Sequence, residues 1–214
     1  MNIQTLGIFL ATCFFLSATP GPNMLSALSM GVRHGLGGAA WGGIGMCAAL
    51  GMLAALSALG LGVLLAASPT AFMIFKWLGV AYLVWLGVQA LRAPVPAEGE
   101  EAAAASAVTG KGREGSRAGL FMQGTLITAS NPKALIFMAA FFPQFLDPAQ
   151  PVAPQLSILV AVMLVIEFGW IMTYAAGGRT LARRLSGRRA TLWLNRGTGL
   201  LLIAAGLLLA LAAL

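Results

Sequence analysis

The amino-acid sequence predicts an all-α integral membrane protein with six transmembrane helices. They form two inverted three-helix repeats, and the first helix of each repeat (helices 1 and 4) is broken. Of the 214 residues, 59% are hydrophobic and only 9% are charged, whereas a soluble domain carries about 25% charged residues. The apolar residues also fall into six stretches, each near the roughly 20 residues that a helix needs to cross a bilayer. A soluble protein of this composition could not cover its surface.

Each predicted helix is an apolar stretch bounded by polar or helix-breaking residues. In order, the helices cover residues 3–30, 38–66, 71–91, 118–142, 155–177 and 191–211. The second helix carries small residues four apart, as at Gly38 and Gly42, and this spacing lets helix backbones approach closely in lipid. The start of the chain lacks a positively charged region before its apolar run, so we expect the first helix to be retained and not cleaved.

The only long polar segment divides the chain into two halves. Residues 92–117 are rich in Ala, Glu, Gly and Pro and show no apolar periodicity, which is typical of a flexible linker. The predicted units are therefore a first three-helix repeat (1–91), a cytoplasmic linker (92–117) and a second three-helix repeat (118–214).

The distribution of basic residues predicts the orientation. Lys and Arg lie in the connections after the first, third and fifth helices, and the turn after the fourth helix has none. Basic loops stay in the cytoplasm, so both termini are expected on the periplasmic side, and helices one and four run in opposite directions. The net charge of +7 thus reflects membrane topology, and we expect no nucleic-acid partner.

Helix breaks at matching positions in the two halves are the strongest functional signal. Proline removes a backbone donor, and unpaired backbone groups survive at membrane depth only against protein or a water-filled cavity. Paired breaks in inverted repeats point to the central site of a transporter, although a single proline often only kinks a helix. The predicted substrate-binding residues at the breaks are Thr19, Pro20, Gly21, Pro22, Asn23, Asn131, Pro132 and Lys133.

Two ionisable residues lie well inside predicted spans, where each costs roughly 2.5–3.5 kcal/mol. We interpret Lys133 as a partner for a substrate carboxylate and Glu167 as a proton-coupling or ammonium-binding residue. The alternatives are that the two pair with each other or that Lys133 snorkels. Trp170 and Tyr174 share a helix face with Glu167 and are predicted to contact an ammonium through cation–π interactions; the competing interpretation places them in the interfacial aromatic belt.

The sequence offers no signal for catalysis, a metal or a cofactor. Cys13 and Cys47 form no CxxC motif, and His34 has no neighbouring ligand residues. No nucleophile has a base beside it, and no phosphate-binding loop is present, so we do not expect an enzyme. Energy must then come from an ion gradient, and protons are the simplest choice because Glu167 is the only acid predicted to be buried.

Several motifs together resemble the LysE/RhtB family, the lysine exporters and homoserine/threonine efflux proteins. They are Thr-Pro-Gly-Pro-Asn at 19–23, Gly-Val-Arg-His-Gly at 31–35, Lys-Trp-Leu-Gly-Val-Ala-Tyr-Leu at 76–83, Asn-Pro-Lys at 131–133, Phe-Pro-Gln-Phe at 142–145 and Leu-Asn-Arg at 194–196. The resemblance implies six helices, a bacterial inner-membrane location and export of amino acids or their derivatives driven by the proton motive force. Members often carry Asp at the position of Glu167, and the extra methylene here bears on substrate size and coupling.

The leading hypothesis is therefore an amino-acid efflux transporter whose partners are its substrate, protons and the lipid bilayer. An inorganic ion exporter is the alternative within the same class, but clusters of His, Cys or carboxylates are missing from the predicted spans. A membrane electron carrier would need paired cysteines at the breaks, and a non-transporting scaffold would leave Lys133 and Glu167 unexplained. The small-residue faces permit a homo-oligomer.

Overall fold

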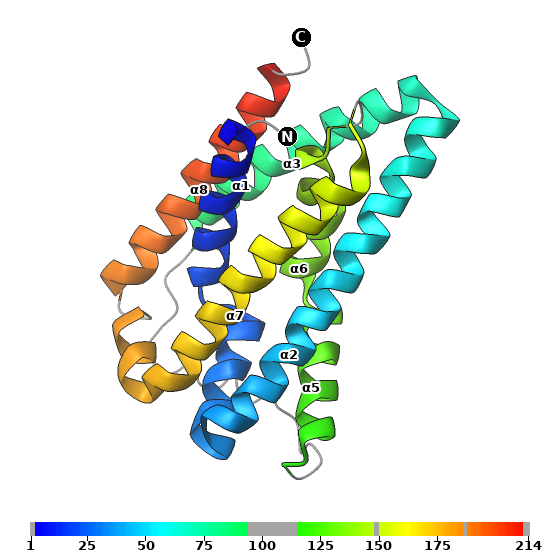
Figure 1. The fold of residues 1–214 in the computed structure, drawn as a ribbon. Helices are drawn as coiled ribbons and strands as arrows, with labels where there is room; N and C mark the ends of the chain where they lie inside the picture. The colour runs from blue at the N-terminus through cyan, green and yellow to red at the C-terminus, as the bar shows by residue number, and fades with distance from the viewer. Residues whose placement is uncertain (1–2, 94–114, 148–149, 186–187, 212–214) are drawn as a thin grey trace.

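The computed structural model describes residues 3–93, 115–147, 150–185 and 188–211, and these residues are helical, with no strand among them (Figure 1). The predicted all-α class is confirmed. The elements are α1 (Ile3–Ala18), α2 (Pro22–Ala67), α3 (Pro69–Arg92), α5 (Arg117–Ala129), α6 (Pro132–Ile136), the π-helical η1 (Phe137–Phe141), the 3-10 helix η2 (Phe142–Phe145), α7 (Val152–Leu185) and α8 (Arg188–Leu211). Most of the predicted linker lies outside the described residues.

Both predicted helix breaks are present. α1 ends at Ala18 and α2 begins at Pro22, and α5 ends at Ala129 while α6 begins at Pro132. In each case proline occupies the first helical position, where its missing N–H costs nothing. α1 and the α5–α6 segment run in opposite directions along the bundle (Figure 1).

A glycine separates the second half of the first predicted helix from the helix that follows. Gly35 has φ 67° and ψ −177° inside the continuous element α2, a backbone conformation that is essentially restricted to glycine. The chain therefore turns within a single residue. The predicted connection between the helices at 3–30 and 38–66 is therefore present at Gly35, but it is shorter than expected.

The described helices include segments suited to a bilayer. By length and apolar composition Pro22–Gly60 and Val152–Gly177 can each cross a membrane, and Arg117–Ala129 with Pro132–Phe145 can form a third span bent by 62°. The apolar parts of α1 (Gln4–Ala18) and α3 (Trp77–Arg92) are shorter. The total of six spans stays a prediction.

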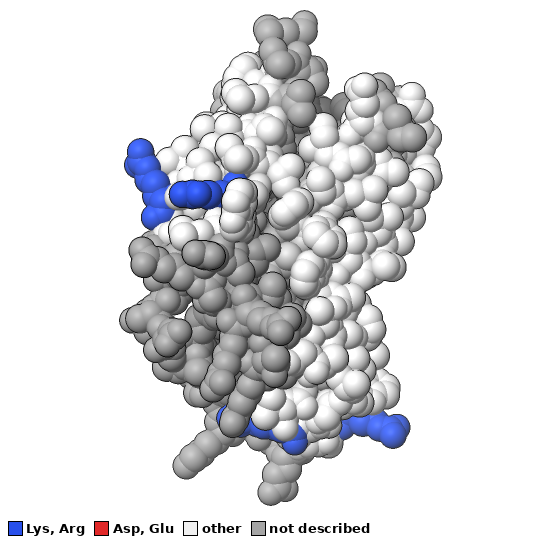
Figure 2. Space-filling view, turned by 90° about the vertical axis from the view of Figure 1, so that its left-hand side faces the viewer, with Lys and Arg blue, Asp and Glu red and all other residues white. Residues whose placement is uncertain are grey.

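Basic residues are sparse on the face shown in Figure 2. The described Lys and Arg side chains on this face lie in a few small groups, and the other described residues visible there are uncharged. The exposed arginines of the described chain are Arg33, Arg92, Arg117 and Arg196. An uncharged surface of this kind is what lipid contact requires.

Close helix packing depends on glycines. α2 lies along α5 and α7, and α3 lies along α8. A Cβ added to Gly45 would lie 2.0 Å from the Phe121 carbonyl oxygen, and one added to Gly124 would lie 2.0 Å from that of Gly42. Backbone contact of this kind is the normal way in which membrane helices pack. The predicted small-residue packing of the second helix is present, although Gly45 was not among the predicted positions.

Candidate functional site

The two helix breaks meet at a pair of buried asparagines. Asn23 follows the first break and Asn131 precedes α6, and they are 6% and 5% exposed. The Asn131 Nδ2 donates to the Asn23 Oδ1 at 3.0 Å, and the Asn131 Oδ1 accepts from the Lys133 backbone N at 3.0 Å. Asn131 is thus the N-cap of α6 and also ties the second break to the first.

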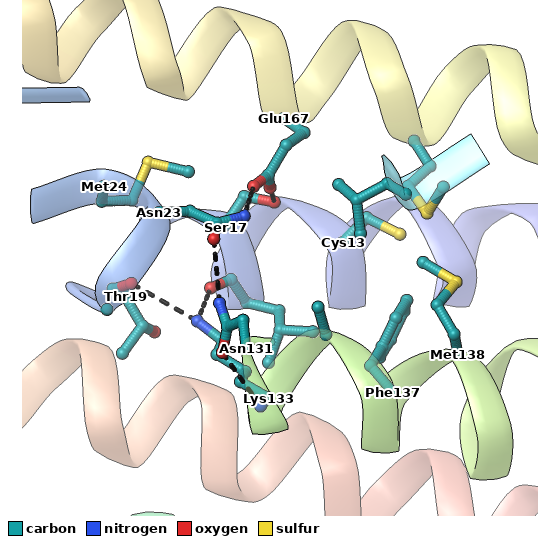
Figure 3. Close-up of a pocket in the computed structure, with 15 residues that line it drawn as sticks. Cys13, Ser17, Thr19, Asn23, Met24, Asn131, Lys133, Phe137, Met138 and Glu167 are labelled. Carbon is teal, nitrogen blue, oxygen red and sulfur yellow. Dashed lines mark hydrogen bonds between the residues drawn. The ribbon is translucent and has the colours of Figure 1, made fainter. Parts of the chain in front are cut away.

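Glu167 on α7 continues this chain of hydrogen bonds. Its Oε2 accepts from the Ser17 Oγ at 2.5 Å, and its Oε1 accepts from the Asn23 Nδ2 at 3.2 Å. The side chain is 7% exposed, so these two donors replace the water that a carboxylate would otherwise bind. A continuous polar path therefore runs from Glu167 through both asparagines to the backbone of Lys133 (Figure 3).

The Lys133 ammonium binds the end of α1. Its Nζ donates to the Leu16 carbonyl oxygen and, at 3.4 Å, to that of Thr19. The last carbonyls of a helix have no partner within the helix, and the helix dipole makes this end attractive to a cation. Within the described residues no direct ion pair joins Lys133 to Glu167, and each of the two side chains is held by other partners.

Other side chains donate to two further carbonyls near the end of the broken helix. The Tyr174 Oη donates to the Ala18 carbonyl oxygen at 2.8 Å, and the Thr19 Oγ1 donates to that of Phe15 at 2.8 Å. The Thr19 Oγ1 also lies 3.0 Å from the Thr198 Oγ1 on α8. The end of α1 is therefore held by groups from α6, α7 and α8, as irregular backbone at membrane depth requires.

A pocket opens beside these groups (Figure 3), with an empty volume of about 500 Å³ counted out to its open mouth. The polar residues of its lining are Ser17, Thr19, Asn23, Asn131, Lys133 and Glu167. The remaining lining residues are Gly21, Cys13 and hydrophobic residues.

The structure brings together most, but not all, of the predicted site residues. Those that line the pocket are Thr19, Gly21, Asn23, Asn131, Lys133 and Glu167, whereas Pro20, Pro22, Pro132, Trp170 and Tyr174 are not part of the lining. Pro22 and Pro132 begin helices, and the Trp170 ring contacts the rings of Phe14 and Tyr174. A direct contact of Trp170 or Tyr174 with substrate stays a prediction.

Sequence reasoning missed several residues of the site. Ser17 is two residues before the first break, in the last turn of α1, and this position was a usable signal. Met138 and Met163 line the pocket and Thr198 contacts Thr19. None of the three carries a local signal, because only the packing of helices against one another brings them there. Both cysteines are free, and Cys13 lines the pocket.

Comparison with known proteins identifies the class as a membrane translocator. The LysE-type translocator model matches residues 14–213, so the chain belongs to this family. It is 35% identical to the homoserine/homoserine lactone efflux protein of Salmonella typhi over 212 residues, which cover 99% of this chain and 98% of the relative. It is 28% identical to the leucine efflux protein of Enterobacter sp. (strain 638) over 197 residues, 91% of this chain and 90% of the relative. It is also 33% identical to an uncharacterized membrane protein of Vibrio cholerae over 216 residues, 99% of each chain. No solved structure matches the chain significantly.

Proposed function

We propose that this protein is a secondary transporter that exports an amino acid or a close derivative across the inner membrane. Its family and the printed names of its relatives, which export homoserine, homoserine lactone and leucine, support this function. One observation carries the proposal. The pocket where the helix breaks meet holds an ammonium and a carboxylate that are not paired with each other.

The spare hydrogen-bonding capacity of these two groups fits a zwitterion. An ammonium has three donors, and Lys133 uses two of them on the carbonyls of Leu16 and Thr19. The third is free for a substrate carboxylate. A carboxylate has about four acceptor positions, and the Glu167 oxygens receive bonds from Ser17 and Asn23. A further acceptor position can therefore take a hydrogen bond from the substrate ammonium.

The proposal includes the transport cycle and the arrangement in the membrane. Six spans in two inverted repeats, 1–91 and 118–214, would place the breaks near mid-membrane with both termini periplasmic. The opposite directions of α1 and α5–α6 support this arrangement. Export would be driven by protons, with Glu167 as the coupling residue, because it is the only acidic residue among the described residues that line the pocket.

Efflux from cells preloaded with labelled amino acids tests this function. Expression of the protein should accelerate release of at least one amino acid, and a collapsed proton gradient should abolish the acceleration. Lys133→Ala and Glu167→Gln should each reduce release to the level of cells without the protein, while the variants still insert in the membrane.

Matched controls change the same chemistry outside the pocket. Asp147→Asn removes an exposed acid and Arg196→Gln an exposed cation, and both should export at the normal rate. Normal export by both pocket variants would refute the site. A lack of accelerated efflux for every amino acid, homoserine derivative and dipeptide tested would refute the function.

A further inference from the structure

The pocket has a polar end and an apolar end. At the polar end lie the groups proposed to bind the zwitterion. To one side of them, Figure 3 shows Cys13, Phe137 and Met138. These three residues belong to one buried hydrophobic cluster together with Leu50 and Met163, which also line the pocket. We call these five residues the apolar end.

The apolar end is a buried wall. Its members are 2% to 7% exposed, and they come from α1, α2, the start of η1 and α7. Within the described chain, Lys133 and Glu167 are the only charged residues that line the pocket. If both are engaged by the zwitterion, no charge remains for the side chain of the substrate.

The backbone of this wall is fixed where the helix changes type. Phe137 and Met138 begin the π-helical segment that follows α6, and π turns within helices are frequent at functional sites. The Ser57 Oγ donates to the Met138 carbonyl oxygen at 2.6 Å, which anchors the turn to α2. The Met138 side chain is thereby held at the pocket while its unbranched thioether adapts to different shapes.

We propose that the substrate is a neutral amino acid with an apolar side chain, such as leucine or methionine, which packs against the apolar end. This inference rests on the proposed function. A charged side chain would lose its hydration here without gaining a partner, which is very unfavourable. A side chain with a hydroxyl would lose less hydration free energy than a charged one, but it would lack the packing contacts that an additional carbon group makes with the apolar end.

A substrate panel measured in preloaded cells or proteoliposomes tests the class. Leucine and methionine should be exported with kcat/KM at least about tenfold above that of homoserine, the low end of the discrimination that one methylene gives in an apolar pocket. Lysine and aspartate should show no efflux above cells that lack the protein. Equal or faster export of homoserine, lysine or aspartate would overturn the inference.

Variants of the wall test its role directly. Met138→Ala and Met163→Ala enlarge the apolar end, so the ratio of phenylalanine to leucine efflux should rise by about tenfold. Met122→Ala is the matched control, because Met122 is 53% exposed on α5 and outside the pocket, and it should leave the ratio unchanged. An unchanged ratio in both pocket variants would contradict the proposal. If neither variant inserts, the wild-type panel decides.

Binding to the purified protein separates this inference from the proposed function. A ligand that binds only the folded state raises the unfolding temperature. Leucine and methionine should therefore raise the unfolding temperature of the protein in detergent more than homoserine does, and lysine should not raise it. If no amino acid stabilises the protein or is exported, the proposed function fails. If amino acids are exported but polar ones stabilise as well as leucine, only the apolar side-chain preference fails.

Discussion

Asn131 is expected to hold the two helix breaks together, and its substitution tests this. Its Oδ1 caps α6 and its Nδ2 donates to Asn23, each at 3.0 Å. Loss of an N-cap costs about 1 kcal/mol. A buried Asn23 acceptor left without its donor costs about 1–3 kcal/mol. Asn131→Ala should therefore destabilise the protein by about 2–4 kcal/mol.

Asn131→Ser separates the two contributions. The serine hydroxyl can still cap α6, but it is too short to reach Asn23, so the expected loss is about 1–3 kcal/mol. For a chain of this size each kcal/mol lowers the unfolding temperature by about 2–4 °C. Thermal unfolding of the purified protein in detergent should rank the proteins as wild type, Asn131→Ser and Asn131→Ala, in order of falling stability.

The neighbouring serine provides the control. Ser130 is exposed, and its hydroxyl bonds only to carbonyls of its own helix, so Ser130→Ala should change stability by less than about 0.5 kcal/mol. Efflux should fall in both Asn131 variants and stay normal in Ser130→Ala. If Asn131→Ala unfolds at the same temperature as Ser130→Ala, the asparagine link does not stabilise the breaks.

Three further substitutions are expected to lower the unfolding temperature in detergent. Gly45→Ala places a Cβ 2.0 Å from the Phe121 carbonyl oxygen and should lower the free energy of unfolding by about 1–3 kcal/mol. Gly60→Ala is the control, because its Cβ meets nothing within 4 Å, and it should be neutral or stabilising. Equal effects of the two substitutions would contradict close packing of α2 on α5. Tyr174→Phe removes the donor to the Ala18 carbonyl and should cost about 1–3 kcal/mol, and an unchanged midpoint would show that this bond contributes nothing. Gly35→Ala forces alanine to φ 67° and should cost about 1–3 kcal/mol, and an unchanged midpoint would show that the turn does not depend on this conformation.

The sequence predicts those parts of the site that a residue determines locally. Pro22 and Pro132 fix where helices begin regardless of their neighbours, so both breaks were predictable. Lys133 and Glu167 stand out because a charge within an apolar run is costly wherever the chain folds. Their membership of one pocket followed only from the assumption of inverted repeats, and the asparagine link between them could not be predicted.

The remaining features depend on contacts between distant segments. α2 carries glycines on several faces, so spacing alone could not show that Gly45 lies against the Phe121 carbonyl of α5. Met138 and Met163 could not be assigned to the pocket from the sequence, because a methionine in a membrane helix looks the same whether it faces lipid, protein or a pocket. Thr198 lies 179 positions from its partner Thr19, and no local pattern marks it.

The breaks and the buried charges explain one another. A helix that ends at Ala18 leaves carbonyls that must find donors within the membrane, and Lys133 and Tyr174 supply them. A carboxylate at that depth must find donors too, and Ser17 and Asn23, on either side of the first break, supply them. Without the break, Lys133 would lack free carbonyls and Glu167 would lack Asn23. The proline motifs, the lysine and the glutamate that the sequence shows separately are therefore parts of one structure, and a change in any of them should disturb the others.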